Sequence, residues 1–470
     1  MAPRSESQKP PKIRRQRPRK TPVLKPYVEL ATPARRIARV LFPIGLGFFC
    51  LVYGFYFALT VPYLIVPFAL PIVLLMLLSI WALPDRPHAP TKAMEFLFSA
   101  LLISLVVWPN YLALALPGLP WITALRLTGF PMAFFLLICL STSEDFRTEL
   151  QRMFEAVPGF WKIFAVFVVM QFITVLLSKE PSAAISRAVL QQINWTGVMV
   201  VCAWVCLKPG RAERYVGLIL LLALPIIPMT IIEFREQHVL WSQHVPSFLK
   251  VDDPVAALIL SSAVRGATGL YRAKATFSTP LGLAEFLALL TPFALHVAVS
   301  GYKPVIRLGC ALALPLIFYC IRLTDARLGV VGFFVSVLLY LLFWGLLRLR
   351  RNRGDLVAAA VVYPYPAVFG LAVAAILSVR RLNIMVFGDG AQAASNEARQ
   401  NQLEMGVPKI FANPIGHGPG GSGPAMGYGA DAFITIDNYY LSIGLDYGVI
   451  GLTMFLAIFL LAIVMNSSGP

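Results

Sequence analysis

Apolar stretches long enough to cross a bilayer recur along this chain of 470 residues. A membrane helix needs about 20 mostly apolar residues, because the hydrocarbon core is about 30 Å thick. Hydrophobic residues make up 58% of the chain and charged residues 13%, whereas a soluble domain is about half apolar and a quarter charged. We therefore expect an all-α polytopic membrane protein, a bundle of about 12 transmembrane helices. The expected spans are residues 40–60, 62–83, 95–116, 121–141, 161–178, 193–207, 215–233, 283–300, 305–322, 328–347, 356–377 and 448–465.

Lysine and arginine are distributed unevenly, and their distribution predicts the orientation of the bundle. Twelve of the 40 Lys and Arg lie before Val40, in a Pro-rich tail. Cytoplasmic loops carry an excess of these residues, so we expect both termini in the cytoplasm. Every second turn between spans then faces the cytoplasm, and these turns hold Arg86, Lys92, Arg147, Arg152, Lys208, Arg211, Arg214, Lys303, Arg307, Arg348, Arg350, Arg351 and Arg353.

This topology divides the chain into six parts. Residues 1–39 form a basic, disordered cytoplasmic tail, which suits anionic lipid better than nucleic acid because a membrane span follows it. The other five parts are membrane helices at 40–233, an outward-facing loop at 234–282, membrane helices at 283–377, a second outward-facing loop at 378–447, and the last helix at 448–470. We expect the second loop to be the catalytic one, with short helices over the site, and we expect no nucleic-acid partner.

Several classes of site are disfavoured by the pattern of reactive residues. All six cysteines fall inside apolar spans, so no disulfide framework is visible. The five histidines show no spacing typical of a metal site, and we expect neither metal nor cofactor. Few ionisable residues lie well inside the spans, chiefly Arg126, Glu285 and His296, which weighs against a transport pathway through mid-membrane.

Four charged residues stand out on the expected outer side, where arginine runs against the general trend: Arg272, Arg327, Arg399 and Asp437. A guanidinium group suits bidentate contact with a phosphate or diphosphate. Each residue also has a simpler interpretation, because arginine can reach lipid headgroups and Asp is a preferred helix N-cap. Together they favour an anion site facing outward.

The same region carries four motifs in a fixed order. Asp437-Asn438 is followed by nine residues, Gly448, two residues and Gly451. Arg327 ends the run Thr324 to Arg327 at the start of a span, and Arg399 precedes Asn413-Pro414-Ile415-Gly416-His417-Gly418. A run from Arg272 through Phe277 and Pro280 to Phe286-Leu287 opens another span. Over residues 265 to 455, these motifs resemble the O-antigen ligase and Wzy-type polysaccharide polymerase superfamily, whose ligases carry His-Asn, nine residues and Gly-x-x-Gly.

The resemblance implies a metal-independent membrane glycosyltransferase of the bacterial inner membrane, with its active site in the periplasm. The donor would be a glycan on undecaprenyl diphosphate and the acceptor a second glycan, among membrane lipids. Arg327 and Arg399 would then neutralise the diphosphate, with Arg272 as a third cation. Asp437 would be the catalytic base, or would orient the acceptor or pair with an arginine. Lys274, Asn438 and His417 would bind substrate, and His417 is a second candidate for the base.

Three functions stay open on the sequence alone. Asp437 stands where the ligases have His, and Asp-Asn is a familiar ending among exopolysaccharide polymerases. The resemblance therefore favours a polymerase that joins lipid-linked repeat units into surface polysaccharide, with a chain-length regulator as a candidate partner. The alternative is an O-antigen ligase that transfers the glycan to lipid A core or another acceptor. A non-enzymatic polysaccharide transporter or flippase is the third.

Overall fold

The computed structural model describes residues 41, 44–45, 47–56, 65–85, 88–115, 121–249, 254–261, 264, 269–387, 393–428, 436 and 438–467. The chain divides into two compact units, Met1–Leu70 and Pro71–Pro470. In the first unit the apolar helix Gly47–Tyr56 is described. The boundary falls within the next helix, α2 (Ile65–Trp81).

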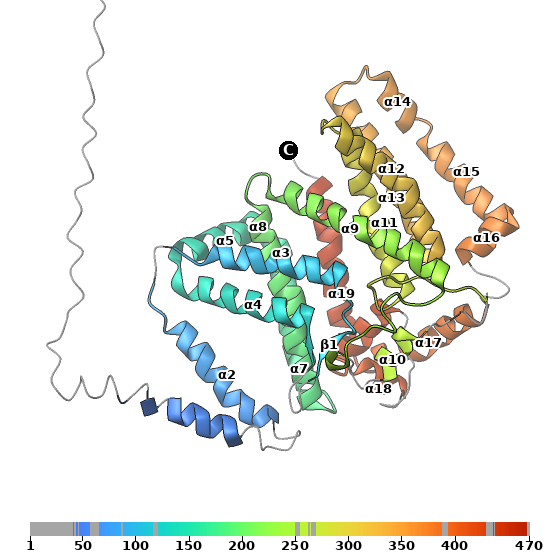
Figure 1. The fold of residues 1–470 in the computed structure, drawn as a ribbon. Helices are drawn as coiled ribbons and strands as arrows, with labels where there is room; N and C mark the ends of the chain where they lie inside the picture. The colour runs from blue at the N-terminus through green and yellow to red at the C-terminus, as the bar shows by residue number, and fades with distance from the viewer. Residues whose placement is uncertain are drawn as a thin grey trace, which may run out of the picture. The chain divides into compact units, whose positions relative to one another are not determined.

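The elements of the second unit are helical almost throughout its described residues (Figure 1). After α2 come α3 (Thr91–Val107), β1 (Ala113–Leu114), β2 (Ile122–Thr123), α4 (Ala124–Thr142), α5 (Glu144–Ala156), α6 (Pro158–Val175), α7 (Pro181–Gln191), a π-helix (Gln192–Gly197), α8 (Val198–Cys206) and α9 (Arg211–Glu236). The rest are a 3₁₀ turn (Ser247–Leu249), α10 (Pro254–Leu260), α11 (Pro280–Val299), α12 (Pro304–Leu323), α13 (Arg327–Arg351), α14 (Leu356–Val362), α15 (Tyr365–Ser378), α16 (Arg380–Phe387), α17 (Ala393–Ala412), α18 (Ser422–Met426) and α19 (Tyr439–Ser467). The two short strands pair antiparallel, with Ala113 opposite Thr123.

The expected fold class is confirmed: the protein is an all-α polytopic membrane protein. Within the described residues, nine helical segments are long and apolar enough to cross a bilayer. They are Ala124–Thr142, Pro158–Val175, Ala183–Cys206, Arg211–Glu236, Pro280–Val299, Pro304–Leu323, Arg327–Arg351, Leu356–Ser378 and Tyr439–Met465. The expected spans at 40–60, 62–83 and 95–116 coincide with shorter helices. The third of these ends at Val107, because the following Trp108 precedes Pro109 and takes an extended conformation.

The last span begins well before its expected boundary. It begins at Tyr439 rather than at residue 448 because Asn438 caps it, its side-chain oxygen accepting from the backbone N–H groups of Tyr440 and Leu441 at 3.0 and 3.2 Å. The helix is then interrupted at Gly448, where φ is 68° and ψ −173°. The expected start of the span is therefore a kink inside a longer element.

Two apolar clusters hold the second unit together. In one, α11 lies at the centre and packs against α9, α12 and α13, with Leu283, Leu287 and Ile317 fully buried (Figure 1). In the other, α3, α4, α5 and α8 meet around Phe98, Met132 and Trp204. The last helix, α19, packs on α6. These contacts fix the helix ends that carry the two long loops.

Both long loops lie at the same end of the helices. The first loop reaches the C-terminal ends of α3 and α12, since the Thr276 hydroxyl donates to Val106 O at 2.6 Å and Ala273 N–H donates to Leu323 O at 3.2 Å. The opposite ends of the helices carry ion pairs: Glu95 with Lys208 and Arg211, Asp85 with Arg147, and Asp355 with Arg348. The basic turns identified in the sequence thus lie at the other end from the loops.

Candidate active site

The segment Tyr271–Thr276 is fastened to the bundle by one carboxylate. Glu233, fully buried in the last turn of α9, accepts from the Tyr271 hydroxyl at 2.8 Å and from the N–H groups of Lys274 and Ala275 at 3.1 and 2.6 Å. A buried carboxylate is tolerated where several donors satisfy it. Ala275 has a φ of 47°, a conformation that these bonds hold in place. The segment is therefore a rigid support for the side chains between its anchor points.

Two of the expected arginines come together at the turn between α12 and α13. Arg272 Nε donates to Thr324 O at 2.9 Å, and Arg327 is the first residue of α13. The Arg327 guanidinium donates to Asn396 Oδ1 at 3.0 Å, and the Asn396 amide donates to Phe387 O at 2.6 Å. Three segments that are distant in sequence, before α11, between α12 and α13, and at the start of α17, are joined by these contacts.

Arg399 and Asn438 lie near the same part of α17. Arg399 is exposed, one turn beyond Asn396. Farther along, Gly406 and Ile410 face Leu441 and Gly444 of α19, so the two helices run parallel. Asn438 precedes Leu441 by one helical turn at the start of α19. It is therefore level with the buried Gln402 of α17, which lies one turn after Arg399. The Asn438 side-chain oxygen is occupied as the cap of α19. Asp437 lies outside the described residues.

The two remaining expected residues lie elsewhere. Lys274 is 6% exposed and turns inward, its ammonium donating to Ile259 O, and burial lowers its pKa. His417 follows the C-terminal end of α17. From Asn396 to Ala412 there are 16 residues of one helix, which is about 24 Å at 1.5 Å per residue. The expected set is thus divided into an arginine cluster (Arg272, Arg327 and Arg399) at one end of α17 and His417 at the other.

The loop that carries His417 is built on the interrupted part of α19. His417 N–H and its ring Nδ1–H both donate to Leu445 O, at 2.9 and 3.0 Å, and Gly418 N–H donates to Asp446 O at 2.9 Å. The buried Asp446 carboxylate accepts from Gly420 N–H at 3.1 Å and Ser422 N–H at 2.7 Å. Gly416 needs its φ of 97°, and an added Cβ there would meet the Asp446 backbone.

Residues 312–456 match the Wzy_C family model, described as O-Antigen ligase. This confirms the resemblance to the O-antigen ligase and Wzy-type superfamily. The matched range, referred to below as the matched segment, runs from α12 through the kink of α19 and includes Arg327, Arg399 and His417, while Arg272 precedes it. No curated protein matches the chain, and no solved structure does. The match supports a membrane glycosyltransferase-like enzyme with a ligase- or polymerase-type role in polysaccharide assembly, acting on lipid-linked glycan and acceptor substrates.

The matched segment contains two important polar residues that the sequence did not single out. The Asn396 amide joins Arg327 to α16. Asp446 holds the loop after His417, and Glu233, outside the matched segment, holds the loop before α11. The available signal was a carboxylate within the first or last turns of an apolar span, where an unsatisfied charge would be costly.

Among the described residues, no group of three or more His, Cys, Asp or Glu side chains could hold a metal ion. The expectation of a metal-independent site stays a prediction.

Proposed function

We propose that this protein is the polymerase that joins undecaprenyl-diphosphate-linked oligosaccharide repeat units into surface polysaccharide, an exopolysaccharide or O-antigen, at the periplasmic face of the inner membrane. The observation that carries this proposal is the arginine cluster. Arg272 bonds the turn that precedes Arg327, Arg327 bonds Asn396, and Arg399 follows on the next turn of α17. Guanidinium groups from three separate segments at one end of the bundle suit a diphosphate held at the membrane surface.

The reaction needs charge stabilisation at the leaving group. A hydroxyl of the acceptor sugar attacks the anomeric carbon of the donor, the bond from that carbon to the diphosphate oxygen breaks, and the diphosphate leaves with the electron pair. Arg327 and Arg399 would neutralise the negative charge that develops on it, with Arg272 supporting them. One preorganised donor of this kind contributes about 3 to 4 kcal/mol to transition-state stabilisation.

The hydroxyl proton needs an acceptor, and we assign it to Asp437. The next residue, Asn438, is level with the turn of α17 after Arg399, and this supports the assignment. Ala412, the last residue of α17, is about 24 Å along the helix from Asn396, and His417 follows five residues later, so we place His417 outside the centre at which the proton is taken. We therefore assign His417 to substrate binding only.

The charges at the two ends support an orientation. Basic turns with ion pairs lie opposite the loops, and by the positive-inside rule we propose that the arginine cluster faces the periplasm and that both termini are cytoplasmic. A polyprenyl chain would then lie in the outer leaflet beside α13 and α17. A protein that regulates chain length is a further expected partner.

One observation favours a second function. The family model over residues 312–456 is described as O-Antigen ligase, so transfer of finished glycan to lipid A core or another acceptor is the competing proposal. A non-enzymatic flippase is disfavoured because the arginine cluster sits at the helix ends and not between the helices.

A deletion strain complemented with variants tests the proposal. Loss of a polymerase leaves single repeat units on the carrier lipid, loss of a ligase leaves full-length chains there, and loss of a flippase leaves units at the cytoplasmic face. We expect single repeats, and we expect Arg327→Ala to reproduce the deletion while Arg327→Lys restores part of the polymer. Arg353→Ala, an exposed residue at the opposite end, is the matched control and should give wild-type polymer. Full-length lipid-linked chains in the deletion strain would overturn the assignment in favour of a ligase.

A further inference from the structure

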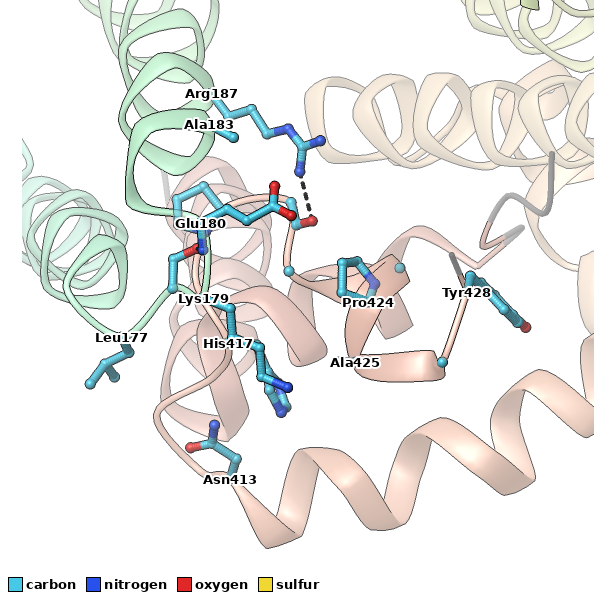
Figure 2. Close-up of a pocket in the computed structure, with 16 residues that line it drawn as sticks. Leu177, Lys179, Glu180, Ala183, Arg187, Asn413, His417, Pro424, Ala425 and Tyr428 are labelled. Carbon is cyan, nitrogen blue, oxygen red and sulfur yellow. Dashed lines mark hydrogen bonds between the residues drawn. The ribbon is translucent and has the colours of Figure 1, made fainter. Parts of the chain in front are cut away.

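A large pocket lies at the other end of α17 from the arginine cluster. It has a volume of about 890 Å³ and lies between the α6–α7 connection, with α7 beside it, and the loop from Asn413 to Tyr428 (Figure 2). Its position next to the N-terminal part of α19 puts it at the same end of the bundle as the arginine cluster. Its size is that of a small-molecule site, and the proposed chemistry at the arginine cluster does not use it.

The walls of the pocket are held in place. Arg187 of α7 donates to Gly420 O at 2.7 Å, which fastens the α7 wall to the loop (Figure 2). Asp446 holds the N–H groups of Gly420 and Ser422 from beneath. Because the His417 Nδ1–H donates to Leu445 O, the ring is fixed in one tautomer and its Nε2 is left as an acceptor. The site is thus largely preformed.

The composition of the lining points to a sugar and not to an anion. Lys179 and Arg187 are offset by Glu180 in the lining and by the Asp446 carboxylate below it, in contrast to the arginine cluster. Hydroxyl groups both donate and accept, and the pocket offers ammonium donors together with carboxylate and imidazole acceptors. The Tyr428 ring and the faces of prolines 419 and 424 supply flat apolar surface against which the C–H face of a pyranose ring packs.

We propose that this pocket is a remote glycan subsite, which binds sugar residues of the substrate several units away from the bond that is made. The proposal rests on the proposed function, since it assumes that a lipid-linked glycan reacts at the arginine cluster. A glycan whose reacting end lies at Arg327 and whose body runs along α17 from Asn396 would cover about 24 Å to reach Ala412, beyond which the loop with His417 begins. The subsite would make the enzyme selective for the composition of the repeat unit and for its length.

Gly423 offers a way to fill the pocket without disturbing the fold. It lines the pocket in α18, and a Cβ added there meets no heavy atom within 4 Å. Gly423→Trp should therefore occupy the space, and Gly423→Ala is the matched control. Lys179→Ala, at an exposed position in the lining, removes one ammonium donor and is a second test should the tryptophan variant fold poorly.

The experiment measures binding of lipid-free oligosaccharides to the purified full-length protein in nanodiscs. The probe is the oligosaccharide released by mild acid from the source organism's surface polysaccharide, with a maltooligosaccharide as the control probe. We expect binding to wild type and Gly423→Ala, and a loss of affinity of about tenfold or more in Gly423→Trp, with a smaller loss in Lys179→Ala. A probe that is extended by the enzyme marks an acceptor subsite, and one that inhibits without being extended marks a donor subsite; either supports the proposal.

Two outcomes would overturn it. Equal binding by wild type and Gly423→Trp, both with the same melting temperature, would show that the pocket does not hold glycan. Competition by inorganic diphosphate and not by oligosaccharide would make the pocket an anion site. Failure of the subsite is distinguishable from failure of the polymerase assignment: the first leaves polymer made by wild type and Gly423→Trp alike, and the second leaves no transfer product from wild type.

Discussion

Two loops meet the membrane helices at the same end of this protein, and each is fastened by one buried carboxylate. Glu233 on α9 receives the N–H groups of Lys274 and Ala275, and Asp446 on α19 receives those of Gly420 and Ser422. The first loop is a segment without glycine between Tyr271 and Pro280 that presents side chains, with Arg272 directed to the arginine cluster. The second is rich in glycine and comes so close to α19 that backbone meets backbone.

The difference shows how one kind of anchor serves two purposes. At the first loop, Tyr271 and Lys274 are buried while Arg272 reaches the turn before α13, so the anchor fixes the direction of side chains. At the second loop, glycines at positive φ let the chain wrap around a helix and leave a hollow beside it. In both cases the carboxylate is well satisfied only while the loop is in place, so loop and helix depend on each other.

The largest expected effect comes from removing the first anchor. Glu233→Ala leaves the Tyr271 hydroxyl and the backbone N–H groups of Lys274 and Ala275 without their acceptor, and it removes the negative charge that stabilises the buried Lys274 ammonium. We expect a loss of about 3 to 5 kcal/mol in the free energy of unfolding. Thermal unfolding in detergent checks the stability, and polymer yield should fall because Arg272 loses its support. A variant as stable as wild type would mean that the bonds to Glu233 are not the anchor.

Substitution of the glycine at the kink tests the second loop by steric means. In Gly448→Ala the added Cβ would lie 1.9 Å from Pro414 O, at a φ of 68°. We expect a loss of about 3 kcal/mol, from overpacking and the left-handed backbone together. Gly427→Ala is the control, since its φ of 86° carries the backbone cost but no atom lies within 4 Å. If both variants lose the same stability, contact between loop and helix contributes little.

Removal of the second carboxylate should have a more local effect. Asp446→Asn keeps one acceptor oxygen and turns an NH₂ group toward a backbone N–H, so we expect a loss of about 1 to 2 kcal/mol. Hydrogen exchange should accelerate at Gly420 and Ser422 and stay unchanged at Ala275. Acceleration at all three amides would show that the two loops open together and would remove the distinction between them.

The smallest effect is the contribution of the first loop to the pH dependence of stability. Burial, reinforced by the charge of Glu233, raises the pKa of Tyr271, so the folded state keeps a proton that the unfolded state releases above pH about 10. The contribution of the protonated Tyr271 hydroxyl to the free energy of unfolding is complete below pH 10. It falls as the pH rises, by about 1 kcal/mol between pH 10 and 11. Burial lowers the pKa of Lys274, which contributes the opposite slope below about 10.5. Melting temperatures across this range should decline less steeply in Tyr271→Phe; an unchanged slope would contradict the assignment.

Hydropathy predicted the helices well, because a membrane span must satisfy its backbone internally and therefore needs a long apolar run. The order of the motifs also led to the arginines that meet near Thr324. The separation of His417 from them was not predictable, since the run around Arg399 suggested only a short helix, whereas α17 extends over 20 residues. Glu233 and Asp446 looked like ordinary polar residues near span ends, and only the loops that return to them, 38 and 24 to 26 residues away at the nearest bonds, reveal their role.

The break in α19 has a consequence for motion. An interrupted helix leaves carbonyl oxygens without hydrogen-bond donors from its own backbone. In α19 these are the carbonyl oxygens of Leu445 and Asp446, which accept from the N–H groups of His417 and Gly418. The loop thus caps the interrupted helix by donating hydrogen bonds to these carbonyl oxygens. If the loop moves away from α19, water must take over these two carbonyl oxygens. Movement of a ligand that displaces the loop is therefore coupled to hydration of the last span.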